Sequence, residues 1–181
     1  MTQIPKAYNA KNYEKGIYQK WEKAGAFMPK GDPKKKPFTI SLPPPNATGQ
    51  LHLGHAMMLA IEDIMVRYNR MQGRPTLWLP GTDHAAIATQ NKVEKIIAEE
   101  GLDRHTMGRA KFLSRVKKYV KESQNTIRNQ IRQMGASVDW TRERYTMDDQ
   151  LTHAVRAAFL QMYKDGLIYR GHRIVNWCTR C

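Results

Sequence analysis

The sequence predicts an α/β fold, and three consecutive segments carry that prediction. Residues 38–42 (Phe-Thr-Ile-Ser-Leu) are rich in strand formers and stop at three prolines, which cannot continue a central strand. A helical pattern begins at Met57, and residues 76–79 (Thr-Leu-Trp-Leu) indicate a second buried strand. Strand, helix and strand in this order form a βαβ unit with parallel strands, whose ligands bind at the carboxyl ends of the strands.

The helix of this unit is predicted from apolar residues at the spacing that lines one helical face. Those residues are Met58, Ile61, Ile64, Met65, Tyr68 and Met71. Gly73, Arg74 and Pro75 break the pattern before the second strand.

Further elements are expected on both sides of this unit. An N-terminal helix over 13–24 is followed by a charged connector, 31–37, which we interpret as a solvated loop. Later helices are predicted over 93–99, over 109–134 with Gly135 as its stop, and from Asp148 or Asp149 to Gly166. Two strands, 167–169 and 174–177, are expected after them.

The loop after the first strand reads as a nucleotide-binding turn. Gly49 and Gly54 let backbone approach a ligand closely, and a helix start presents N–H groups to an anion such as phosphate. His52 and His55 stand three residues apart, so both imidazoles can reach one side of that site and stabilise charge on a phosphoryl group. The alternative is that they are simply two polar residues at a helix start.

The loop after the second strand, residues 80–90, is expected to face the same crevice. Its carboxylate, Asp83, is a poor phosphate ligand but a good partner for a substrate ammonium group. A helix N-cap is the structural alternative for Asp83, and it is compatible with that role.

Composition points to a polyanionic partner and a cytoplasmic protein. A formal net charge of +14 over 181 residues favours RNA over DNA or an anionic membrane. No apolar run reaches the length of a membrane span, and the N-terminus lacks a signal-peptide core, so no membrane partner is expected. One face of the 109–134 helix is either a solvated surface or a stripe that tracks phosphates; its cations are Lys117, Lys118, Lys121, Arg128 and Arg132.

The two cysteines, Cys178 and Cys181, form half of a zinc site at most. Zinc normally takes four ligands, and no second pair is present, so we predict no metal ligand in this chain.

These motifs together resemble the class I aminoacyl-tRNA synthetases, and most closely their valine-specific branch. Residues 43–55 (Pro-Pro-Pro-Asn-Ala-Thr-Gly-Gln-Leu-His-Leu-Gly-His) look like the first signature of that family, with 52–55 as its HIGH element. Three later segments match in the same order: 81–90, 139–143 (Asp-Trp-Thr-Arg-Glu) and 166–178. The sequence departs from the family pattern at Ala47, commonly valine, and at Ala86, commonly glycine.

The resemblance implies activation of valine by ATP to valyl-adenylate, with Mg²⁺, and transfer of valine to its tRNA. It implies a catalytic role for His52 and His55, and it assigns ATP binding to Thr48, Gly49, His52, Gly54 and His55. It assigns valine binding to Pro43, Pro44, Asn46, Asp83 and Gln90. Two rival interpretations are a non-catalytic nucleotide- or RNA-binding module, and a nucleotidylyltransferase of another pathway; the match around Asp83 argues against the latter.

The resemblance also implies a domain plan. Residues 1–36 are expected to form an N-terminal helix and connector, 37–177 the first half of a Rossmann-like catalytic domain, and 178–181 the start of a junction to an editing insertion. The fold class is therefore a partial Rossmann-like parallel sheet with long flanking helices. No lysine loop of the KMSKS type is present, so the remaining part of a synthetase is an expected partner.

Overall fold

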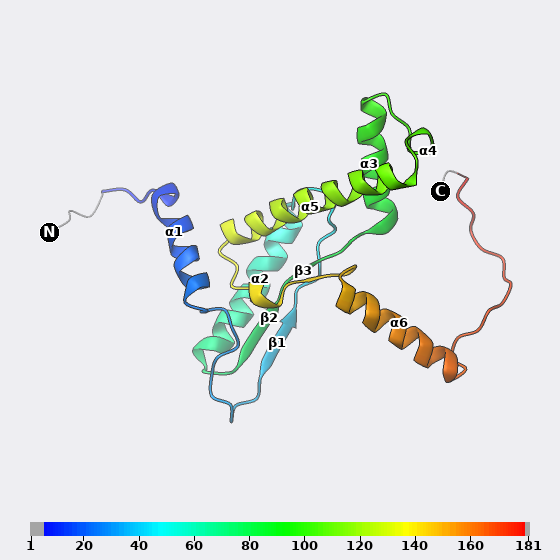
Figure 1. Cartoon of the computed structure of the whole chain (residues 1–181). Helices are drawn as coiled ribbons and strands as arrows, with labels where there is room; N and C mark the ends of the chain where they lie inside the picture. The colour runs from blue at the N-terminus through cyan, green and yellow to red at the C-terminus, as the bar shows by residue number, and fades with distance from the viewer. Residues whose placement is uncertain (1–5, 180–181) are drawn as a thin grey trace. The chain divides into compact units, whose positions relative to one another are not determined.

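The computed structural model describes residues 6–179, which divide into two compact units, one up to Thr146 and one from Met147 onward. The helices of the first unit are α1 (Ala10–Lys23), α2 (Leu53–Met71), α3 (Ala86–Glu99), α4 (Arg104–Met107), α5 (Arg109–Gln133) and a 3₁₀ turn at Trp140–Arg142. Its strands are β1 (Phe38–Ser41), β2 (Thr76–Leu79), β3 (Gly81–Thr82) and β4 (Arg144–Tyr145); the second unit contains α6 (Asp149–Lys164). Figure 1 shows these elements along the chain. The domain boundaries at 36 and 177 stay a prediction.

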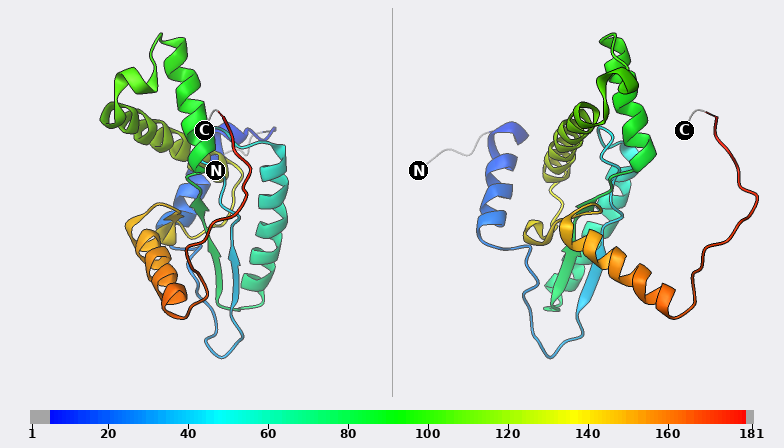
Figure 2. Two further views of the ribbon diagram at one scale, coloured as in Figure 1. Left: turned by 90° about the vertical axis from the view of Figure 1, so that its right-hand side faces the viewer. Right: turned by 45° about the vertical axis from the view of Figure 1, so that its right-hand side comes forward.

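The predicted βαβ unit is confirmed. β1 and β2 pair in parallel from Phe38 opposite Thr76 to Ser41 opposite Leu79, and α2 packs along both strands (Figure 2). The buried core between strands, α2 and α5 consists of Leu42, Leu59, Val66, Trp78, Ile127, Ile131, Ala136 and Val138. Trp78 is fully buried and donates from its indole nitrogen to Glu62 Oε2 at 2.9 Å, which satisfies its one polar atom.

The face that α2 buries differs from the predicted one. Leu59 and Val66 are buried, whereas most of the apolar residues predicted to share a face are exposed: Ile61, Ile64, Met65, Tyr68 and Met71. The helix prediction was right and the packing prediction was wrong, because α2 is apolar around most of its circumference and periodicity alone does not select one side.

A second parallel pair, β3 with β4, continues the chain beyond β2. Gly81 lies opposite Arg144, and a Cβ at Gly81 would stand 2.9 Å from the Arg144 carbonyl oxygen, so only glycine allows this approach. The 3₁₀ turn before β4 is capped by the buried Asp139, whose Oδ1 accepts from the Thr141 amide at 3.1 Å and hydroxyl at 2.6 Å. The 139–143 segment therefore sets where β4 begins.

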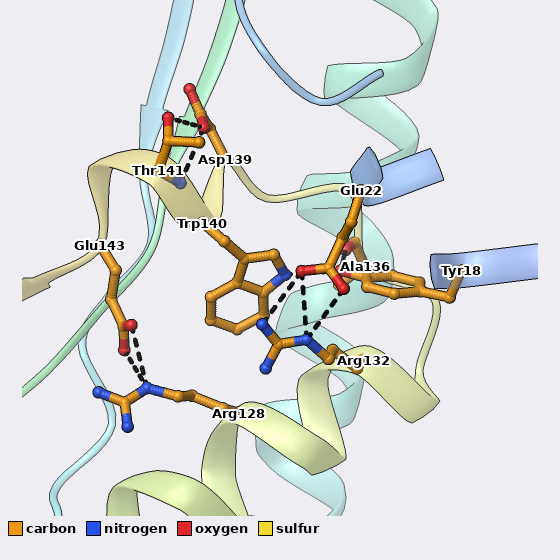
Figure 3. Close-up of polar contacts among 9 residues, drawn as sticks. All are labelled: Tyr18, Glu22, Arg128, Arg132, Ala136, Asp139, Trp140, Thr141 and Glu143. Carbon is orange, nitrogen blue, oxygen red and sulfur yellow. Dashed lines mark hydrogen bonds and ion pairs between the residues drawn. The ribbon is translucent and has the colours of Figure 1, made fainter. Parts of the chain in front are cut away.

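A polar cluster ties α1 and the 139–143 segment to α5 (Figure 3). The Tyr18 hydroxyl donates to the Ala136 carbonyl at 2.7 Å and accepts from Trp140 Nε1 at 2.9 Å, and burial raises the pKa of Tyr18 to about 12. Arg132 lies 4.2 Å from the Trp140 ring centre and pairs with Glu22. This cluster holds α1 against α5 and the segment that follows it.

Two cations of the predicted phosphate-tracking stripe are used in such contacts. Arg128 Nε donates to Glu143 at 2.7 Å, and Arg132 pairs with Glu22 at 3.1 Å. Each of these two arginines belongs to an ion pair that holds neighbouring segments together, so neither is simply a solvated cation; the phosphate-tracking alternative stays a prediction.

The second unit contains the predicted last helix but not the predicted strands. Asp148 is the N-cap of α6, and its Oδ1 accepts from the Leu151 amide at 2.7 Å. Residues 167–169 and 174–177 adopt no strand in the described part of this unit, and all their apolar side chains except that of Ile168 are exposed. A strand needs a pairing partner, and apolar composition does not supply one. None of the described helices has both the length and the apolar character to cross a bilayer.

Candidate active site

The two loops singled out in the sequence meet at one end of β1 and β2. The Asp83 amide donates to the Pro45 carbonyl, and the Ala47 amide donates to the Asp83 carbonyl, both at 2.8 Å. Asn46 and Asp83 thus form a parallel bridge. Backbone hydrogen bonds therefore hold the turn that is predicted to bind an anion next to the loop that carries Asp83.

His52 and His55 cap the start of α2 reciprocally. His52 Nδ1 accepts from the Gly54 amide at 3.1 Å, and His55 Nδ1 accepts from the His52 amide at 3.2 Å. Their ring centres are 3.9 Å apart. The alternative interpretation, that His52 and His55 are polar residues at a helix start, is therefore correct for both. It does not conflict with a role in catalysis.

This capping determines the tautomer of both rings. A nitrogen that accepts a hydrogen bond carries no proton, so in the neutral rings the proton sits on Nε2, which is a donor. Burial lowers the pKa of His55, and the neighbouring His52 lowers it further. In their neutral forms the two imidazoles offer two Nε2–H donors that the caps do not use.

Glycines make this arrangement possible. A Cβ on Gly54 would lie 3.0 Å from His52 Cε1 and 3.1 Å from its Nδ1, so the His52 ring lies directly over that backbone position. Gly49 has φ 148°, in the region that favours glycine. The spacing of glycine and histidine in this turn follows from the close approach of the ring.

The other predicted site residues lie around the same loops. Pro43 and Pro44 are exposed, as are Asn46 and Gln90, the latter on α3. The carbonyl of Thr48 accepts from the Tyr119 hydroxyl at 2.7 Å, which ties the turn to α5.

Asp83 belongs to a small polar group with His84 and Thr146. The Thr146 hydroxyl lies 2.9 Å from Asp83 Oδ1, 2.6 Å from His84 Nδ1 and 2.9 Å from the His84 amide nitrogen. His84 Nδ1 is 3.5 Å from Asp83 Oδ1. The carboxylate is therefore held by a residue 63 positions further along the chain.

The start of α3, directly after this group, is strained. Ala85 has φ 51° and ψ 17°, Ala86 has φ 27°, and the helix has no side-chain cap. The N-cap alternative for Asp83 is thus wrong, because Ala85 occupies that position. Instead the Thr89 hydroxyl donates to the His84 carbonyl at 2.6 Å. Left-handed alanines cost energy that the surroundings must offset.

No group of three or more His, Cys, Asp or Glu side chains within residues 6–179 is arranged to hold a metal ion. Cys178 is exposed, and Cys181 lies outside the described residues.

A family model described as tRNA synthetases class I (I, L, M and V) matches residues 16–181. The chain belongs to this synthetase family. It is 53% identical over 179 residues, 99% of its length, to the valine–tRNA ligase of Clostridium acetobutylicum, of which it covers 20%. It is 56% identical over 164 residues to the valine–tRNA ligase, chloroplastic/mitochondrial 2, of Arabidopsis thaliana, covering 91% of this chain and 17% of the relative.

A solved structure agrees with the synthetase fold. The chain superposes with TM-score 0.71 and 22% identity on a LeuRS of Agrobacterium radiobacter K84, solved as a ternary complex with tRNA and LeuAMS. The match covers 90% of this chain and 19% of that one. The partial Rossmann-like fold is thereby confirmed. The chain spans about a fifth of the length of the curated relatives it matches.

Sequence reasoning missed three residues that shape this synthetase site. Tyr119 holds the first loop, while His84 and Thr146 surround Asp83. His84 directly follows Asp83, a predicted site residue, so its position in the sequence could have indicated that it belongs to the site. Tyr119 and Thr146 come close only through packing, and no local pattern marks them.

Proposed function

We propose that this chain forms part of a valine–tRNA ligase and carries residues that activate valine with ATP. The observation that carries the proposal is the backbone bridge between Asn46 and Asp83. It joins the loop that leads to the two imidazole donors to the loop that carries the carboxylate. Identity above 50% with valine–tRNA ligases over nearly the whole chain supports valine as the amino acid.

Activation is an in-line displacement. A carboxylate oxygen of valine attacks the α-phosphorus of ATP, a P–O bond forms, and the bond to pyrophosphate breaks. The Nε2–H groups of His52 and His55 donate to phosphate oxygens as negative charge builds on them. Thr48, Gly49 and Gly54 shape the backbone that approaches the phosphates, and no covalent bond to the protein is needed.

The amino acid lies on the Asp83 side of the site. The Asp83 carboxylate binds the ammonium group of valine, Pro43 and Pro44 form a rigid wall, and Asn46 and Gln90 supply polar contacts. A charged hydrogen bond of this kind orients the carboxylate of valine for attack.

Mg²⁺ belongs to the nucleotide in this proposal. Mg²⁺ usually keeps several waters and binds through substrate phosphates together with one or two carboxylates. Transfer to tRNA is the second proposed step, and the formal charge of +14 supports an RNA partner.

Amino-acid-dependent exchange of pyrophosphate into ATP tests the proposal. In the full-length protein, valine is expected to give a higher kcat/KM than isoleucine, leucine or methionine. A higher kcat/KM for isoleucine, leucine or methionine would show that the substrate is that amino acid and not valine. No exchange with any of them would favour a non-catalytic nucleotide- or RNA-binding module.

A further inference from the structure

The hydroxyl of Thr146 sits at a junction that no local sequence pattern marks. β4 pairs with β3, with Tyr145 opposite Thr82, and the Thr146 amide donates to the Thr82 carbonyl at 3.2 Å. This pairing places the Thr146 side chain beside the first residues after β3. Gln124 of α5 also supports β3, because its Nε2 donates to the Thr82 hydroxyl at 3.0 Å.

Counting protons at this hydroxyl decides the direction of each contact. A threonine hydroxyl has one proton and two acceptor lone pairs. The His84 amide can only donate to it, and an ionised Asp83 carboxylate can only accept from it, so the single proton points to Asp83. The remaining contact, 2.6 Å to His84 Nδ1, then requires the imidazole to donate. In the neutral form of His84 the proton is therefore on Nδ1, and Nε2 is a bare acceptor.

We propose that Thr146 is a positioning residue for the amino-acid side of the site: its hydroxyl aligns the Asp83 carboxylate for an α-ammonium group and holds His84 in the Nδ1–H tautomer. This inference rests on the proposed role of Asp83. Thr146 donates to Oδ1, and no hydrogen bond to Oδ2 is found among the described residues, so Oδ2 is available to the ammonium group.

The site then contains imidazoles whose Nε2 atoms have opposite hydrogen-bonding roles. His52 and His55 present Nε2–H donors, as suits phosphate oxygens, whereas His84 presents a Nε2 acceptor beside a carboxylate, as suits a cation. Each loop thereby presents the hydrogen-bonding groups that suit the charge of its proposed ligand.

The tautomer is measured directly by long-range ¹H–¹⁵N correlation on ¹⁵N-histidine-labelled protein at pH 8. His84 is assigned by comparison with His84→Gln. A protonated Nδ1 and bare Nε2 on His84, with the reverse on His52 and His55, is the expected result. A His84 ring protonated on Nε2 would overturn the hydroxyl arrangement, and this measurement needs neither activity nor a Thr146 variant.

Kinetics test the positioning role. Thr146→Val keeps the shape and removes the hydroxyl, so in the full-length protein the KM for valine is expected to rise about tenfold while the KM for ATP stays unchanged. Thr146→Ser restores the hydroxyl and should return the valine KM to the wild-type value. Thr126→Val is the matched control, since within residues 6–179 its hydroxyl bonds the Glu122 carbonyl of the same helix and no residue of the candidate site.

The outcomes separate this inference from the proposed function. Wild-type protein without valine-dependent exchange refutes the proposed function and with it the ammonium role, while the tautomer measurement still decides the Thr146 contacts. Active wild type with an unchanged valine KM in Thr146→Val refutes the positioning role alone. Equal rises in both KM values would assign Thr146 to general structure instead.

Discussion

The two helices that begin at the candidate active site start in opposite ways. α2 is capped by its own first turn, because His52 and His55 each accept from a backbone amide within that turn. α3 has no side-chain cap, and two successive alanines in the left-handed region lead into it. The segment leading into α3 is instead held by Thr89 from within the helix and by Thr146, the residue directly after β4.

The difference shows that one part of the candidate site is positioned by contacts within a single turn and the other by contacts between distant residues. On the side proposed to bind phosphate, the helix start is capped within residues 52–55, and Tyr119 of α5 adds one long-range contact to the preceding turn. The Asp83 side depends on strand pairing across 63 residues and stores backbone strain next to a proposed ligand contact. Changes at α2 should therefore affect chemistry with little effect on folding, and changes near α3 should affect both.

The largest effect is expected from removing the imidazoles while keeping the caps. His52→Asn retains an N-cap acceptor and His55→Gln retains the reciprocal contact, so stability should change little. Loss of one donor aimed at transition-state charge costs about 2.7–4 kcal/mol, and each variant should slow pyrophosphate exchange about 10²–10³-fold. Exchange rates and ATP affinity are measured in parallel; equal losses in both would mean ground-state binding rather than catalysis.

Asp83→Asn should have the next largest effect. The amide keeps an oxygen for the Thr146 hydroxyl but loses the charge that attracts an ammonium group. Hydrogen bonds to charged groups contribute about 1.5–3 kcal/mol, so the KM for valine should rise about 10- to 100-fold, with the ATP KM unchanged. A parallel rise in the ATP requirement would show that Asp83 organises the whole bridge between the loops.

A smaller, opposite effect is expected where α3 begins. Ala85→Gly removes the Cβ from a residue at φ 51° and should raise the free energy of unfolding by about 0.5–1 kcal/mol. Ala88→Gly, one turn inside the same helix, should lower it by about 0.5–1 kcal/mol. Chemical denaturation compares the two; the same sign for both would contradict strain at Ala85.

The smallest effect is a pH dependence from His55. Its pKa is lowered in the folded state, chiefly by burial, so the unfolded chain binds more protons as pH falls below the ordinary value of about 6.5. The stability that neutral His55 contributes is complete above that pH and is lost on acidification toward the lowered pKa. Denaturation midpoints of wild type and His55→Gln should be similar at pH 8, and the wild-type midpoint should fall below that of the variant as the pH is lowered to 5. Parallel curves would exclude this contribution.

The sequence by itself determined the elements whose signals are local. The two parallel strands, the helices α2, α5 and α6, and the turn with its histidine pair follow from periodicity, capping residues and breakers that act within a few positions. The bridging of the two loops also follows, because carboxyl ends of adjacent parallel strands share one edge.

Only the tertiary structure decided which surfaces meet. It selected Leu59 and Val66 rather than the Ile61 side of α2, paired Arg128 with Glu143, and brought Thr146 to Asp83. Helical periodicity shows that a face is apolar but not what covers it, and a charge or hydroxyl carries no mark of its distant partner. These outcomes depend on contacts across the chain, which packing and strand register establish together.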